Sequence, residues 1–156
     1  MITKTSLVAA VFGVAMIGAP AMAEEFRPLN TNVDLDGTLT LSQSTTLDCD
    51  VDVSLSIDGN GDATVNSRSF SAGDWQCGIF VAPSGTWTVD PGPGTSKVTM
   101  TVGASSILGS CSGTIQADFN NSTGVVTFNN VSIPGTPNAC TINGSLSSTP
   151  QASIVP

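Results

Sequence analysis

Hydrophobic and polar residues alternate along most of this chain. In the clearest segment, 47–57, every second residue is apolar and the residues between are Asp or Ser. Side chains of a β-strand point alternately to its two faces, so this pattern predicts strands with one buried and one solvated face. The pattern recurs over 33–41, 63–70, 77–81, 87–89, 98–102, 111–119, 126–133 and 140–146.

Turn-forming residues separate these segments. Segments 58–62, 90–94 and 120–124 are rich in Gly, Asn, Asp or Pro, and each predicts the turn of a hairpin. After Phe128 the alternation changes phase, which predicts a β-bulge at Asn129 and Asn130. About nine short strands, without a convincing amphipathic helix, predict an all-β fold that is an antiparallel β-sandwich or a related barrel.

Residues 1–23 have the features of a cleaved signal peptide. Lys4 precedes an apolar run from Leu7 to Ile17, and small residues lead to a cleavage site after Ala23. We therefore expect one mature domain over residues 24–156. No apolar run reaches the ~20 residues of a membrane-spanning helix, so we expect no permanent membrane anchor. The expected location is extracellular or on the cell surface, reached through the periplasm.

Four cysteines lie in phase with the apolar residues of the alternating segments. An even number of cysteines in an exported chain favours disulfides over metal ligands. The predicted structural disulfides involve Cys49, Cys77, Cys111 and Cys140. Four cysteines allow three pairings, which remain open at this point, with sequential pairing preferred. Each loop closed in that way would stabilise the fold by about 3–4 kcal/mol.

The charge and composition exclude several classes of function. Lys4 is one of four Lys and Arg residues, so without it three basic side chains face twelve acidic ones, a net charge of −9. Nucleic acids and anionic lipids are therefore poor partners. The chain has no histidine that could act as the base for a serine nucleophile. Lys97 is the one lysine left for this role, and it lies on an expected solvent face. We expect no enzyme, no cofactor and no catalytic residue.

Segment 58–62 resembles the start of a calcium-binding loop. Asp58, Asn60 and Asp62 have the spacing of its first three oxygen ligands. An EF-hand loop would continue with Gly and Glu where this chain has Ala63 and Ser69. A tight hairpin turn is therefore favoured, and these three residues are kept as a candidate cation site.

A cluster of five aspartates lies on the solvated faces of two neighbouring predicted strands, 33–41 and 47–57. Its carboxylates repel one another, and either a divalent cation or full solvation at a charged strand edge would relieve the repulsion. Solvation is favoured, and no metal is expected at Asp34, Asp36, Asp48, Asp50 and Asp52.

The two tryptophans differ in their predicted environments. Trp87 is in phase with Val89 and is expected in the core. Trp75 lies in a polar loop before Cys77 and is the better candidate for ligand contact, because an exposed aromatic face can bind a sugar ring or an apolar molecule.

Several short motifs follow one another through the mature chain in a recognisable order. They are Phe26-Arg-Pro-Leu, Leu47-Asp-Cys49, Trp75-Gln-Cys77-Gly-Ile, Gly85-Thr-Trp87, Gly109-Ser-Cys111-Ser-Gly, Asn138-Ala-Cys140-Thr-Ile and the terminal Ile154-Val-Pro156. In this order the chain resembles the alkane oxidation activator PraB family of small exported bacterial proteins. The resemblance covers nearly all of residues 24–156, and the acidic strands depart from it.

The resemblance implies a secreted, non-enzymatic protein that promotes alkane use at the hydrocarbon or cell surface. Adsorption at an oil–water boundary is favoured over hydrocarbon binding inside the domain. A disulfide-linked core packed with Val, Leu and Ile is expected to leave no cavity for a ligand. One alternative is an adhesin or biofilm matrix subunit that self-assembles through strand edges or polar faces. Another is a carbohydrate-binding module that uses Trp75.

Overall fold

The computed structural model describes residues 23–156, and these residues form β-strands joined by turns and loops, without a helix. Within this range no helix is long and apolar enough to span a membrane. The strands are β1 (Glu25–Arg27), β2 (Thr31–Ser42), β3 (Thr46–Ile57), β4 (Ala63–Ala72), β5 (Val81–Pro83), β6 (Thr88–Pro91), β7 (Lys97–Ser106), β8 (Gly109–Asn120), β9 (Val125–Ile133), β10 (Gly135–Thr136), β11 (Cys140–Thr149) and β12 (Ser153–Val155). The additions to the predicted set are the short strands β1, β10 and β12.

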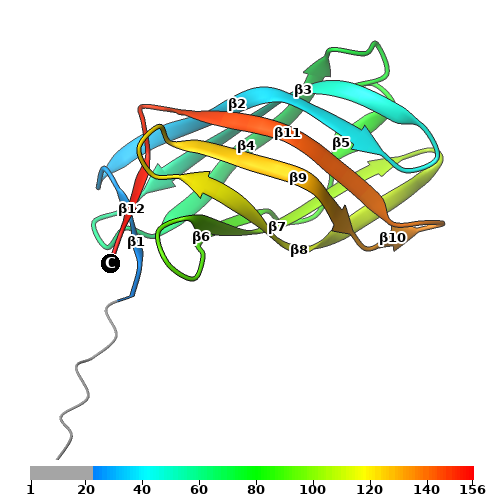
Figure 1. Cartoon of the computed structure of the whole chain (residues 1–156). Helices are drawn as coiled ribbons and strands as arrows, with labels where there is room; N and C mark the ends of the chain where they lie inside the picture. The colour runs from blue at the N-terminus through cyan, green and yellow to red at the C-terminus, as the bar shows by residue number, and fades with distance from the viewer. Residues whose placement is uncertain (1–22) are drawn as a thin grey trace, which may run out of the picture.

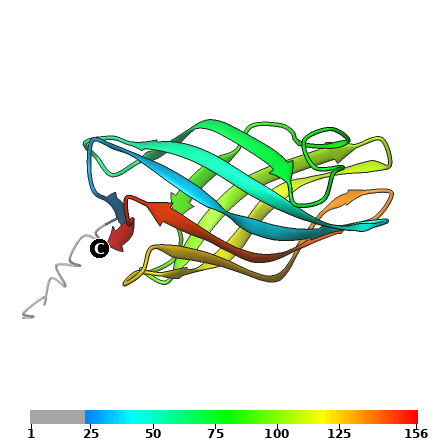
Figure 2. The ribbon, with the colours of Figure 1, turned by 90° about the horizontal axis from the view of Figure 1, so that it is seen from above.

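Ten of these strands form one antiparallel sheet that curls into a nearly closed barrel (Figures 1 and 2). Its order is β4-β3-β2-β11-β9-β8-β7-β5, with β6 also paired to β7 and β10 to β8. The remaining strands, β1 and β12, pair with each other in a separate small sheet. The structure thus confirms the all-β, barrel-related fold and the three predicted hairpins, β3–β4, β6–β7 and β8–β9.

The alternating sequence sets which face of each strand is buried. In β3 the apolar residues from Leu47 to Ile57 are buried, whereas Asp48, Asp50 and Asp52 are exposed. A shift of the pairing by one residue would place these carboxylates in the core and the apolar side chains in water. Burial of a Val, Leu or Ile side chain stabilises a protein by about 1.5–3 kcal/mol, so the observed register is strongly preferred.

The predicted bulge is present in β9. Phe128 pairs with Gly144 and Val131 pairs with Ile142, so Asn129 and Asn130 together face a single residue of β11. Asn130 has a φ of 48°, in the left-handed region that asparagine tolerates better than most residues. The bulge explains why the alternation changes phase after Phe128.

The predicted strand over 77–81 is wrong for most of its length. Ile79 is exposed, and only Val81 belongs to a strand, β5. The backbone N–H groups of Ile79, Phe80 and Val81 all donate to the carbonyl of Gln76, at 3.3, 2.8 and 3.1 Å. The chain therefore turns tightly after Gln76, and the apparent alternation has no strand to support it.

The two ends of the barrel differ, and we call them the closed and the open end. At the closed end, strands β1 and β12 form a cap over the barrel, and their side chains Phe26 and Ile154 are buried as part of the core. Asn121 fastens this cap, because its side chain donates to the Ile154 carbonyl at 2.9 Å and accepts from the Ile154 N–H at 2.6 Å. The opposite, open end carries the β2–β3 and β7–β8 turns, the loop 73–80 and β10 (Figure 1).

The first and last strands of the sheet order, β4 and β5, are not paired by backbone hydrogen bonds. Side-chain contacts between β4 and the β5–β6 segment close the barrel there. Arg68 of β4 donates to the carbonyl of Gly85, and its guanidinium lies 5.9 Å from the centre of the Trp87 ring. Phe70 and Trp87 pack with ring centres 6.1 Å apart. These contacts hold the wall of the barrel together just beneath the open end.

Candidate functional site

Large apolar side chains are exposed at the open end on two adjacent loops. Trp75, Ile79 and Phe80, in the loop between β4 and β5, are 66%, 72% and 42% exposed. Ile107 and Leu108, in the β7–β8 turn, are 83% and 56% exposed. Pairing of Val81 with Ser106 brings these two loops side by side. We call the five residues Trp75, Ile79, Phe80, Ile107 and Leu108 the apolar tip.

The loop that carries three of these five residues is firmly attached to β3. A disulfide joins Cys77 to Cys49, and Asp74 forms two hydrogen bonds with the Asp48 backbone, at 2.6 and 2.8 Å. Trp75 and Phe80 pack edge to face, with ring centres 5.5 Å apart. The exposed side chains therefore project from an anchored loop. Large exposed apolar side chains gathered at one end of a molecule are typical of an interaction site.

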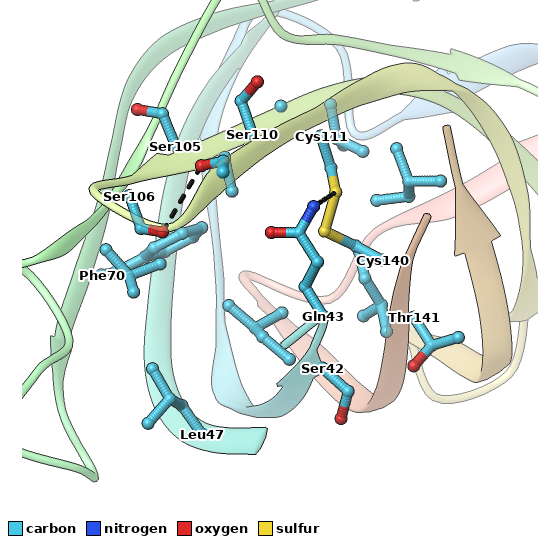
Figure 3. Close-up of a pocket in the computed structure, with 18 of the residues that line it drawn as sticks. Ser42, Gln43, Leu47, Phe70, Ser105, Ser106, Ser110, Cys111, Cys140 and Thr141 are labelled. Carbon is cyan, nitrogen blue, oxygen red and sulfur yellow. Dashed lines mark hydrogen bonds between the residues drawn. A yellow bond between two sulfur atoms is a disulfide. The ribbon is translucent and has the colours of Figure 1, made fainter. Parts of the chain in front are cut away.

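A cavity of about 90 Å³ lies beside the tip, inside the open end of the barrel (Figure 3). Its deep part is lined by buried apolar residues, including Leu39, Leu47, Phe70, Trp87, Val102 and Ile142. Its outer part is lined by hydroxyl and amide side chains, including Ser42, Gln43, Thr45, Ser105, Ser106 and Ser110. Because exposed residues such as Thr45 and Ser110 belong to the lining, the cavity reaches the surface. No charged residue lines it.

Gln43 lies at the mouth of the cavity and connects two of its walls. From the β2–β3 turn its side-chain amide donates to the carbonyls of Asn138 and Thr136, at 2.7 and 3.3 Å. In Figure 3 the same amide extends toward the disulfide between Cys111 and Cys140, and its nitrogen lies 3.4 Å from the Cys111 sulfur. The mouth is thus shaped by a hydrogen-bonded side chain and a covalent link.

The four predicted cysteines form two disulfides, Cys49–Cys77 and Cys111–Cys140, which is the sequential pairing. Both lie at the open end, the first under the tip and the second in the cavity wall. Trp75 is exposed in the tip and Trp87 is buried in the cavity wall, as their sequence contexts indicated.

The candidate cation residues lie at the closed end, away from the cavity. One oxygen of Asp58 accepts the backbone N–H groups of Asn60 and Asp62, at 2.8 and 3.1 Å. These bonds, that of Asn60 foremost, lower the pKa of Asp58 below its ordinary value. The favoured hairpin turn is therefore formed, while cation binding by Asp58, Asn60 and Asp62 stays a prediction.

The acidic face of β2 and β3 is interrupted by hydroxyl groups. Asp36 pairs with Asp52 across the two strands. Thr38 donates to the Asp50 carboxylate at 2.7 Å, and Thr40 donates to that of Asp48 at 2.6 Å. Among residues 23–156 no group of three or more His, Cys, Asp or Glu side chains could hold a metal ion.

The cavity and most of the tip are absent from the predictions made from the sequence. The expectation of a core without a vacancy is wrong at the open end, where the cavity lies beside the Cys111–Cys140 disulfide. The pair Ile107-Leu108 between Ser106 and Gly109 was the available signal, because two adjacent apolar residues in a hairpin turn cannot both be buried.

Comparisons with known proteins yielded one match. The family model described as "Alkane oxidation protein activator PraA/PraB-like" matches residues 1–156, the whole chain. Neither the curated proteins nor the solved structures contained a match.

Proposed function

The chain belongs to the alkane oxidation protein activator PraA/PraB-like family, and from this premise we propose that it promotes alkane use by attaching to hydrocarbon surfaces through the apolar tip. The observation that carries the proposal is the gathering of five exposed apolar side chains at one end of the barrel. A hydrocarbon surface is the environment in which such side chains lose contact with water most completely.

The size of the tip is adequate for adsorption. Complete burial of one large apolar side chain contributes about 1.5–3 kcal/mol, so five partly exposed ones would contribute on the order of 5–10 kcal/mol. The rest of the surface is polar and acidic, with three basic and twelve acidic side chains in residues 24–156. An adsorbed molecule would therefore place its tip in the oil and keep its charged walls in water.

We infer that the protein acts outside the cell and without catalysis. Support for export comes from the signal-like features of residues 1–23, which lie almost wholly outside the described residues. Support for a non-catalytic role comes from the chain's lack of histidine and from Lys97, which pairs with Asp118 near the closed end. Neither residue borders the cavity or the tip.

The tip also bears on the carbohydrate-binding alternative. A sugar-binding tryptophan presents a free, flat face, and polar side chains commonly surround it to bond the sugar hydroxyls. Trp75 instead packs against Phe80 and belongs to an apolar group. This arrangement favours an apolar partner.

The direct test is the interfacial tension of a hexadecane–water boundary in the presence of purified mature protein. We expect the wild type to lower the tension, and the double variant Ile79→Ser/Ile107→Ser to lose most of this effect. Both residues are more than 70% exposed and neither lines the cavity, so the variant keeps its fold. Thr123→Ser, at the closed end, serves as the control.

A second experiment links adsorption to alkane use. A strain without the gene is grown on a long-chain alkane and on a soluble carbon source, with wild-type or tip-variant protein added to the medium. Slower growth on the alkane alone, restored only by the wild type, is the expected result. Unchanged tension together with detergent-resistant assemblies would overturn the proposal in favour of an adhesive or matrix subunit.

A further inference from the structure

We propose that the cavity at the open end binds the terminal segment of one unbranched, uncharged alkyl chain. This inference rests on the proposed function and deepens it, since it assigns a defined site to a single hydrocarbon molecule. Adsorption through the tip needs no such site.

The dimensions of the cavity favour the end of a slender chain. At about 90 Å³ it is smaller than the ~150 Å³ of a cavity that admits a benzene ring. It is also well below the ~300 Å³ at which sites for whole drug-sized ligands begin. A chain end would therefore enter the cavity while the rest of the chain lies outside it.

Several polar groups around the cavity, including the buried indole of Trp87, already have partners within the protein. The indole N–H of Trp87 donates to the carbonyls of Ser84 and Gly103, both at 3.1 Å. The amide of Gln43 donates to the carbonyl of Asn138 at 2.7 Å. Ser106 donates to the carbonyl of Gly109 and accepts the N–H of Leu108. An apolar guest would thus leave the Trp87 indole, the Gln43 amide and the Ser106 hydroxyl in their present hydrogen bonds, so its entry would cost none of these bonds.

The charges around the site favour an uncharged ligand. The lining contains no cation that could pair with a carboxylate. Asp48 and Asp74 lie in the neighbouring segment that anchors the tip, and residues 24–156 carry a net charge of −9. A fatty acid would therefore bind more weakly than a neutral molecule with the same chain.

The cavity is continuous with the tip through Leu108. This residue is 56% exposed as part of the tip and also lines the cavity. A chain that leaves the cavity at this side would run onto an apolar surface instead of into water. Leu108 thus links the tip to the cavity, whose outer part also carries hydroxyl and amide side chains and whose deep part reaches Trp87.

The binding test uses Trp87 as the reporter and 1-hexanol as the probe. Trp75→Phe removes the other tryptophan and retains an aromatic side chain in the tip. We expect 1-hexanol to change the Trp87 fluorescence in a saturable way. Sodium hexanoate, with the same chain length, and cyclohexanol, with the same number of carbons in a ring, are each expected to bind at least tenfold more weakly. A response to 1-hexanol without saturation, or equal affinity for hexanoate, would overturn the inference.

Filling the cavity gives a second test. Ala104 lines the cavity, whereas Ala82 on the adjacent strand β5 is exposed and does not. Ala104→Leu is expected to weaken 1-hexanol binding at least tenfold, while Ala82→Leu, which adds the same atoms outside, leaves it unchanged. Leu41→Phe, another lining position, replaces Ala104→Leu if that variant does not fold. Unaltered binding in a folded cavity-filling variant would refute the site.

The two proposals fail in different ways. Ala104→Leu should still lower the hexadecane–water tension, and Ile79→Ser/Ile107→Ser should still bind 1-hexanol. Adsorption without saturable binding removes the cavity inference alone. Saturable binding without adsorption removes the proposed surface attachment alone.

Discussion

The two tryptophans show how strongly local context decides the role of one residue type. Trp87 is 8% exposed and contacts the Arg68 guanidinium, the Phe70 ring and two backbone carbonyls. Trp75 is 66% exposed and touches Phe80 by an edge-to-face contact. The first therefore belongs to the wall that closes the barrel, and the second to the surface of the tip.

Replacement of each tryptophan by phenylalanine should separate these roles. Trp87→Phe removes the indole donor of the Ser84 carbonyl and one of the two donors of the Gly103 carbonyl, which keeps the Ser84 N–H at 2.9 Å. We expect a loss of about 1–3 kcal/mol in the free energy of unfolding. Trp75→Phe should change it by less than about 0.5 kcal/mol. Urea denaturation followed by circular dichroism measures both, and equal losses would contradict the assignment.

The turn at Asp58 should make stability depend on pH. Hydrogen bonds from the Asn60 and Asp62 N–H groups lower the pKa of Asp58 in the folded state. The ionised carboxylate thus stabilises the fold fully above the unfolded pKa of about 3.9, and this contribution is lost as the pH falls through the lower folded value.

Asp58→Asn keeps an oxygen acceptor and removes the titration. We expect the difference between the urea midpoints of wild type and variant to be constant above about pH 5. At lower pH the wild-type midpoint should fall further than that of the variant. Other carboxylates, including Asp118, titrate in both proteins and cancel in the difference. Midpoints that fall in parallel down to pH 2 would show that the turn is not charge-stabilised.

At the scale of elements, the two disulfides close loops of nearly equal length. The paired cysteines are 28 residues apart in Cys49–Cys77 and 29 apart in Cys111–Cys140. Loss of either link, by replacement of both cysteines with alanine, should lower the free energy of unfolding by about 3–4 kcal/mol in the chain-entropy model.

Their local effects should differ, because only Cys49–Cys77 anchors the loop of the tip. We expect chymotrypsin to cleave next to Trp75 and Phe80 in Cys49→Ala/Cys77→Ala much faster than in Cys111→Ala/Cys140→Ala. Mass spectrometry of the first fragments identifies the sites. First cleavage elsewhere in the Cys49→Ala/Cys77→Ala variant would contradict this view of the loop.

The strands themselves were largely predictable from the sequence. Where one face is buried, as in β3, alternation reports both the strand and its orientation, and even the bulge at Asn129 and Asn130 left a change of phase. The prediction failed at Ile79, because three residues that alternate by chance in a tight turn look like a strand. Short segments carry too few positions to distinguish the two cases.

The candidate site was much less predictable. Exposure of Trp75 could be expected from its polar neighbours, but the grouping of Trp75 with Ile107 depends on the pairing of β5 with β7. The cavity depends on how far the barrel walls lie apart, which alternation does not encode. The sequence specifies which side chains face inward, whereas the volume they leave unfilled is a property of the whole packed barrel.

At the scale of the whole molecule, large apolar side chains are buried at one end of the barrel and exposed at the other. Ile154 at the closed end is fully buried, and Ile107 at the open end is 83% exposed. The same residue type therefore meets opposite environments at the two ends.

Alanine at these two positions should have opposite effects. Ile154→Ala should lower the free energy of unfolding by about 2–5 kcal/mol and leave adsorption to hexadecane unchanged at a temperature where the variant is folded. Ile107→Ala should leave stability within about 0.5 kcal/mol and reduce adsorption. Thermal unfolding and drop tensiometry on both variants provide the comparison, and a large stability loss in Ile107→Ala would show that the tip is part of the core.

The pairing of β1 with β12 brings both ends of the described chain to the closed end (Figure 2). Lys97, which pairs with Asp118 there, adds the single lysine amine of residues 23–156 to the same region. A fusion partner at either terminus, or a bead coupled through Lys97, would consequently attach the molecule at its closed end. Every copy on such a support would stand with Trp75, Ile79 and Ile107 facing outward, so a layer of this protein would be an oriented coating with an apolar outer surface.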